Sequence, residues 1–109
     1  MQSFKEPKDT DRFHWTKHSM SKMKQYALTP QRVIRILNHP ERHEEAIVEN
    51  CFACVQTIGD KRKTEIWAMY QKVEGQRFRR IITAWRYPGV TKAGDKVPLP
   101  EGLLDEILL

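Results

Sequence analysis

The apolar residues of this chain change their spacing near residue 41, and this change most restricts the fold. Before that point, apolar side chains recur every three or four positions, as on one face of an α-helix. After it, apolar and polar residues alternate over several segments, as in half-buried β-strands. Helical segments followed by a run of strands predict an α+β domain, with the helices packed on one face of a sheet.

Two helices are expected in the first part of the chain. Thr16 is a suitable N-cap for a helix over 17–26, because its hydroxyl can accept a hydrogen bond from a free N–H group of the first turn. Thr29 followed by Pro30 is a second start signal, since proline is favoured at the first helical position. We expect this second helix to end near Asn38, ahead of another proline.

About four strands are expected after the helices, forming a curved antiparallel sheet. They cover 42–49, 51–58, 64–72 and 77–87. In the last of them, simple alternation places Phe78, Ile82 and Ala84 on one face and Arg77, Arg79, Ile81, Thr83 and Trp85 on the other. The segment 13–15 is either a short edge strand or a cover for the core. A short terminal helix is expected over 102–109.

The 109 residues suffice for one domain but not for two. We expect 1–12, which is polar and contains a proline, to be a flexible lead-in, and 13–109 to form the domain. The polar N-terminus is unlike a signal peptide, and no apolar run approaches the roughly 20 residues that cross a bilayer. These features predict a cytoplasmic protein without membrane association, and they leave its oligomeric state open.

Cys51 and Cys54 have the spacing of half a zinc site or of a redox pair. There is no second pair of cysteines, and their segment has the composition of a strand. In a strand, positions three apart point to opposite faces, so the two sulfur atoms would diverge. We therefore expect two small packed residues, with neither a metal nor another cofactor.

The net charge of +5 is unevenly distributed along the chain. Residues 1–40 carry +5 and 61–100 carry +7, whereas 41–60 carry −4 and 101–109 carry −3. Two basic segments that meet in the fold would form one positive face for a polyanionic partner, and RNA is the partner we expect. The alternative is a mixed-charge surface exposed to solvent.

The residue types suit RNA cleavage without a metal. That reaction needs a base for the 2′-hydroxyl, an acid for the leaving oxygen and cations for the phosphate. His18 can serve as the base or the acid, and Lys22, one helical turn away, can supply a cation for the phosphate. The last strand offers cations and a ring that stacks on a base: Arg77, Arg79, Arg80, Arg86 and Tyr87. The alternative for His18 is a histidine at the start of a helix, bonded to the backbone. The alternative for the arginines of the last strand is a face exposed to solvent. Trp67 and Trp85 are expected in the core.

Three motifs in order resemble a known family. An early helix reads HSMSKM (18–23), a YALT turn follows, and the last strand ends in IITAWRYPG (81–89). Over about 13–90 this order resembles the domain-of-unknown-function family 4258 and, more distantly, the BrnT and RelE ribonuclease toxins. The resemblance implies a helix–helix–sheet fold, with an active site on the concave sheet face beside the first helix.

The resemblance also implies roles for individual residues. The family's helix histidine falls on His18, its basic residue on Lys22 and its late-strand hydroxyl on Thr83. Arg86 falls where related toxins tend to carry a basic residue. Two departures are Ser19, where alanine is usual, and Lys22, where arginine is more common. Lysine does not hold a phosphate bidentately, so the second departure weakens the expected grip on a transition state.

Three functions remain open at this point. The first is a metal-independent endoribonuclease, such as the toxin of a toxin–antitoxin pair, in which His18 is the acid or base. Lys22, Arg80 and Arg86 would hold the phosphate of the bound RNA, and Tyr87 would position one of the RNA bases. The second is an RNA-binding module without catalysis. The third is a protein-interaction domain, whose partner covers the sheet edge or the apolar tail at 103–109. An antitoxin-like protein is the partner expected for the first function.

Overall fold

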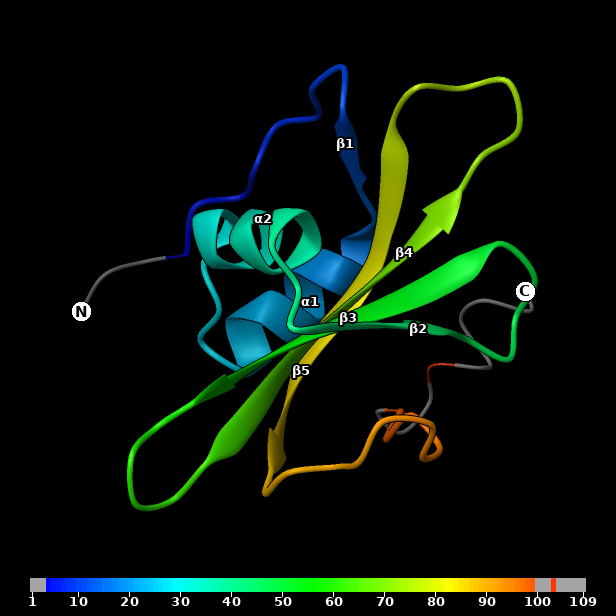
Figure 1. The fold of residues 1–109 in the computed structure, drawn as a ribbon. Coiled ribbons are helices and arrows are strands. Elements are labelled where there is room, and N and C mark those ends of the chain that lie inside the picture. Colours follow the sequence, from blue (N-terminus) through cyan, green and yellow to red (C-terminus); the bar gives the residue numbers. More distant parts are fainter. Residues whose placement is uncertain (1–3, 100–102, 104–109) are drawn as a thin grey trace.

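The computed structural model describes residues 4–99 and Leu103. Its elements are, in chain order, β1 (Phe13–Trp15), α1 (Lys17–Gln25), α2 (Pro30–Asn38), β2 (Arg42–Glu45), β3 (Cys51–Ile58), β4 (Thr64–Lys72) and β5 (Arg79–Pro88). The strands form one sheet in the order β1-β5-β4-β3-β2. Figure 1 shows both helices on the same side of this sheet. The α+β class expected from the sequence is therefore confirmed.

The sheet differs from the expected one in its first strand. Phe13–Trp15 pairs in parallel with residues 79–81 of β5, whereas every other neighbouring pair of strands is antiparallel. The sheet is therefore mixed and has five strands rather than four antiparallel ones, and a strand precedes the two helices. Of the two alternatives for the segment 13–15, the structure shows the short edge strand, and its Phe13 and Trp15 also pack in the first core. Whether the fold is that of the RelE toxins stays a prediction.

Both predicted helix starts are present. Thr16 Oγ1 accepts a hydrogen bond from the Ser19 N–H at 3.1 Å, and Thr29 Oγ1 accepts one from the Arg32 N–H at 3.1 Å. The Thr16 hydroxyl also donates to the Ile81 carbonyl of β5 at 2.9 Å. Thr16 therefore begins α1 and at the same time attaches it to the sheet.

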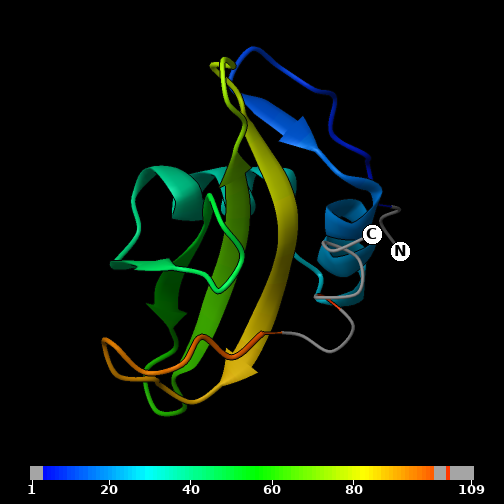
Figure 2. The same cartoon turned by 90° about the vertical axis from the view of Figure 1, so that its right-hand side faces the viewer.

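An apolar core lies on each face of the sheet. The first core joins the helices to the sheet and includes Met23, Val33, Ile36, Ile66 and Ala68. The second core contains Trp67 and Trp85, which are register partners on β4 and β5 with ring centroids 5.6 Å apart. The segment after β5 packs over the second core, on the face away from α2 (Figure 2). Both tryptophans are core residues, as expected.

A bulge in β5 reverses the faces of its side chains. The register with β4 shifts between Met69 and Tyr70, so β5 contains one extra residue at this point. As a result, Ile81 and Ala84 pack in the first core, whereas Ile82 packs in the second. The alternation predicted for this strand, with Ile82 and Ala84 on one face, is wrong because a single inserted residue moves every later side chain to the other face.

Cys51 and Cys54 point to opposite faces of β3. Cys51 packs in the second core and Cys54 in the first, which confirms that their sulfur atoms diverge. In the lead-in, Asp9 Oδ1 accepts a hydrogen bond from the Trp15 N–H at 2.9 Å.

The predicted terminal helix over 102–109 lies outside the described residues except for Leu103, which is buried in the second core. Neither α1 nor α2 is long and apolar enough to span a membrane.

Candidate active site on the helix-side face of the sheet

The residues that the sequence proposed as catalytic are divided by the sheet. His18 and Lys22 lie on α1, which packs on the first core through Met23, and Lys22 Nζ donates to Gln25 Oε1 at 3.1 Å. Thr83 is completely buried and lies opposite Met69, a residue of the second core. Directly opposite residues of an antiparallel pair share a face, so Thr83 faces away from the helices.

Arg86 contacts the end of α1. Its Nε donates to the Tyr26 carbonyl at 2.7 Å, and one terminal nitrogen donates to the Ala27 carbonyl at 3.3 Å. The last carbonyls of a helix have no partner within the helix, so an arginine there satisfies them. Two of the three guanidinium nitrogens are thus engaged in holding the fold together.

The four residues proposed to bind nucleic acid also separate. Arg80 donates to Gln71 Oε1 at 3.2 Å, and Tyr87 packs against the second core. Arg77 and Arg79, by contrast, line the same pocket. The structure therefore brings together two of these four residues.

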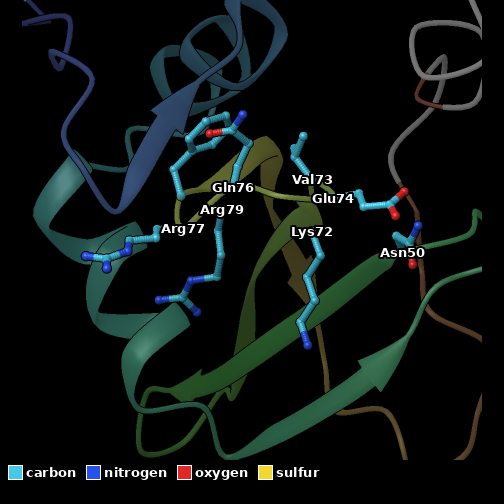
Figure 3. A pocket seen from close by; sticks show the side chains of 8 residues that line it. Asn50, Lys72, Val73, Glu74, Gln76, Arg77 and Arg79 are labelled. Atoms are coloured by element: carbon cyan, nitrogen blue, oxygen red, sulfur yellow. The ribbon is translucent and has the colours of Figure 1, made fainter.

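This pocket has a volume of about 500 Å³ and lies where β4 turns into β5. We call it the basic pocket, and it is lined by Asn50, Lys72, Val73, Glu74, Gln76, Arg77, Phe78 and Arg79. Figure 3 shows the Lys72 and Arg79 side chains extending in the same direction, while Glu74 extends toward Asn50 on the other side. Three positive charges and one negative charge leave the lining with an excess of positive charge.

Lys72 and Arg79 lie directly opposite each other on β4 and β5. Like charges in this relation destabilise a sheet unless an opposite charge neutralises them. Within the described part of the chain, no acidic side chain forms an ion pair with either residue. The two cations are therefore placed to attract an anion from solution.

Arg79 is held in position by neutral groups. Its two terminal nitrogens donate to the Leu37 carbonyl at 3.3 Å and to Asn38 Oδ1 at 3.0 Å, both at the end of α2. The guanidinium also lies over the rings of Phe13 and Tyr70, at 4.8 and 5.0 Å from the centroids. These contacts orient the guanidinium and leave its charge unneutralised.

A row of three rings continues the site across the sheet. His43, Phe52 and Tyr70 come from β2, β3 and β4, and we call them the aromatic row. Ring centroids are 5.1 Å apart between His43 and Phe52 and 5.5 Å apart between Phe52 and Tyr70. Lys72 Nζ lies 5.2 Å from the Phe52 centroid, so the aromatic row adjoins the basic pocket.

His43 Nε2 lies 2.9 Å from the Tyr70 hydroxyl oxygen. The His43 side chain is exposed, whereas Tyr70 is buried. Burial raises the pKa of Tyr70, the Cys54 thiol raises it further, and Arg79 opposes both effects. The hydroxyl therefore stays protonated at neutral pH. A solvent-accessible histidine is thus oriented by a neutral phenol, beside two cations.

Comparison with protein-family models, curated proteins and solved structures found no match for this chain. The likeness to family 4258 stays an expectation. In the described residues, no three potential metal-ligating side chains lie together.

Sequence reasoning missed His43, Phe52, Tyr70 and Lys72. The alternation along β4 does place Tyr70 and Lys72 on one face, so the sequence could have predicted that these two residues share a face of the sheet. Their proximity to His43 depends on the pairing of β2, β3 and β4, which no local pattern specifies.

Proposed function

We propose that this domain binds RNA on the helix-side face of its sheet and cleaves it without a metal. The observation that carries the proposal is the 2.9 Å contact between His43 Nε2 and the Tyr70 hydroxyl, beside Lys72 and Arg79. These residue types supply what the reaction requires: a group that moves a proton near neutral pH, and cations for the charge that collects on the phosphate.

His43 acts as the base in one of its two neutral tautomers. When Nε2–H donates to the Tyr70 oxygen, Nδ1 has a free lone pair. Nδ1 then takes the proton of a 2′-hydroxyl, the 2′-oxygen forms a bond to phosphorus, and the bond from phosphorus to the 5′-oxygen breaks. The leaving 5′-oxygen takes a proton from water, and the products are a 2′,3′-cyclic phosphate and a 5′-hydroxyl. Lys72 and Arg79 stabilise the phosphate oxygens meanwhile.

RNA binding without cleavage is the second candidate function. The unneutralised pair Lys72 and Arg79 supports it directly, because neutralising phosphates with such cations releases counterions and gives affinity that falls with salt. A domain of this kind binds RNA in a salt-dependent way and leaves it intact.

The test is incubation of the purified protein with labelled RNA in EDTA, followed by analysis of the ends. Wild-type protein should yield 2′,3′-cyclic phosphate ends. His43→Gln keeps a side chain that can hydrogen bond to Tyr70 but removes the proton transfer, and we expect a rate loss of roughly a hundredfold or more. His39→Ala, which changes another exposed histidine, is the matched control.

His18→Ala in the same assay examines the site implied by the family resemblance. Loss of cleavage in His18→Ala with full activity in His43→Gln would contradict the site proposed here. RNA that stays intact but is retained on a gel would indicate the binding module. RNA that is neither cut nor bound would exclude both functions.

A further inference from the structure

The end of α2 supplies two hydrogen-bond acceptors to Arg79. Asn38 is the last residue of this helix, His39 leaves the helical conformation, and Pro40 follows it. The Leu37 carbonyl and Asn38 Oδ1 accept hydrogen bonds from the two terminal nitrogens of Arg79, at 3.3 and 3.0 Å. Leu37 is buried in the first core, whereas Asn38 is exposed. The Asn38 side chain can therefore be changed without disturbing the core.

These two acceptors set the orientation of the Arg79 guanidinium. The rings of Phe13 and Tyr70 attract its charge, but a ring restricts the direction of N–H groups less strictly than a hydrogen bond does. A guanidinium has five N–H donors, and the end of α2 takes two of them. Donors therefore remain for an oxyanion on the side toward which Lys72 also extends (Figure 3).

The Asn38 amide leaves the charge of Arg79 uncompensated. An aspartate in its place would have nearly the same shape, and it would form the strong charge-assisted pair that arginine makes with carboxylates. Such a pair would cancel one of the two positive charges, those of Lys72 and Arg79, that lie opposite each other on β4 and β5. Position 38 therefore requires an acceptor that is neutral.

Arg79 also connects the end of α2 with the proposed base. Its guanidinium lies 5.0 Å from the Tyr70 ring centroid, and the Tyr70 hydroxyl lies 2.9 Å from His43 Nε2. Burial raises the pKa of Tyr70, and Arg79 opposes that rise. A displaced Arg79 would therefore alter both the cation beside the phosphate and the surroundings of the phenol that orients His43.

We propose that Asn38 is a positioning residue of the phosphate site formed by Lys72 and Arg79. Its amide orients the Arg79 guanidinium toward a phosphate of RNA and, being neutral, leaves the positive charge available. Asn38 acts through Arg79 and takes no part in proton transfer. This inference rests on the proposed function, because the anion at the site is taken to be an RNA phosphate.

The first measurement is the affinity for single-stranded RNA whose 2′-hydroxyls are methylated, so that wild-type protein leaves it intact. Asn38→Asp should bind this RNA roughly tenfold more weakly than wild type, and the dependence of affinity on salt should fall by about one charge.

Gln31→Glu is the matched control for Asn38→Asp. It makes the same change from amide to carboxylate on an exposed residue of the same helix, about 10 Å away along the axis. Both new carboxylates lie about one turn from Arg35, so pairing with that residue affects them alike. Equal losses of RNA affinity in the two variants would overturn the proposal.

A double-mutant cycle tests whether Asn38 acts through Arg79. Arg79→Gln removes the charge, and Asn38→Asp should weaken binding no further in a protein that already carries Arg79→Gln. A further tenfold loss in the double variant would overturn the proposal. Comparison of Asn38→Asp with Gln31→Glu needs no change at Arg79, so it decides the question even where Arg79→Gln does not fold.

Asn38→Ala removes the acceptor and adds no charge. Its affinity for the methylated RNA should change by less than about threefold, with the salt dependence of wild type. Its kcat for cleavage of ordinary RNA should fall roughly tenfold, because Arg79 is less precisely oriented in the transition state. An equal loss of kcat in Gln31→Ala would indicate a general effect on α2 and overturn the proposal.

The outcomes distinguish this inference from the proposed function. RNA binding that depends on Asn38 in a protein that cuts no RNA would retain the role of Asn38 and refute the nuclease. Cleavage at the wild-type rate in Asn38→Asp would retain the nuclease and refute the role of Asn38. A wild-type protein that neither binds nor cuts RNA would refute both.

Discussion

Arg79 and Arg86 lie seven positions apart on β5, and each donates to a main-chain carbonyl at the end of a different helix. Arg79 reaches Leu37 O at the end of α2, and Arg86 reaches Tyr26 O at the end of α1. The C-terminal end of a helix carries partial negative charge, so a cation there is favourable. A single strand thus fastens both helices to the sheet.

Arg86→Ala should destabilise the fold because it leaves carbonyls at the end of α1 without their partner. We expect the free energy of unfolding in urea to fall by about 1–2 kcal/mol. Arg77→Ala removes an equal charge from an exposed side chain and should change stability by less than about 0.5 kcal/mol. Equal effects of the two substitutions would contradict the role assigned to Arg86.

Thr16 and Thr29 cap their helices in the same way, but only Thr16 is also bonded to β5. Thr29→Ala should cost about 1 kcal/mol, as is usual for the loss of an N-cap. Thr16→Ala should cost about 2 kcal/mol, because it also removes the bond to the Ile81 carbonyl. Urea unfolding of both variants measures the difference, and equal costs would mean that this bond contributes nothing.

Thr91 holds the segment after β5 against the sheet. Its N–H and its hydroxyl donate to the buried carboxylate of Glu65 at 3.0 and 2.9 Å. Arg42 also donates to the Thr91 hydroxyl, at 2.7 Å. Thr91→Val should therefore lower the free energy of unfolding by about 1–3 kcal/mol.

The same substitution should speed amide hydrogen exchange within 91–99, because this segment loses an anchor. Thr64→Val is the control, since the Thr64 side chain forms no hydrogen bond within the described residues. Exchange in 91–99 that is the same in both variants would show that Thr91 is not the anchor.

Cys54 should make stability depend on pH in the alkaline range. Burial raises the pKa of this thiol to about 11 from its ordinary value of 9.0, and Arg79 opposes the shift. Above pH 9 the unfolded chain loses this proton and the folded chain keeps it. Stability therefore falls as pH rises toward 11. The stability of wild type relative to Cys54→Ala should shrink by about 2 kcal/mol across this range.

Chemical denaturation of both proteins between pH 8 and pH 11 provides the measurement. A difference in stability that stays constant over that range would refute the shift. Labelling of native protein with a thiol reagent gives a second readout, because only the thiolate reacts. Cys54 should react slowly at neutral pH.

Local signals in the sequence determined the helix starts and the bounds of two strands, β3 and β4. By contrast, β2 ends at Glu45 instead of at 49, and β5 covers Arg79–Pro88 instead of 77–87. The Thr16 and Thr29 caps act within three residues, and the Thr29–Pro30 pair marks the start of α2 as found. β3 and β4 also have the predicted bounds, because alternation and the turn between them are features of adjacent residues. The basic segment 61–100 contains Lys72, Arg77 and Arg79, which line the basic pocket, and binding of a polyanion there stays a prediction.

Tertiary packing decided between the two alternatives for the segment 13–15, and it alone decided the faces of β5 and the composition of the site. The pairing of Phe13 with Arg79 and the contact of His43 with Tyr70 join residues far apart in the chain. The bulge of β5 lets its side chains pack in both cores, one on each face of the sheet. A short stretch of sequence does not show where such a bulge is needed, because the need arises from the packing of both faces. Caps and periods are properties of a few consecutive residues, whereas strand register is set by the joint packing of segments that the sequence keeps apart.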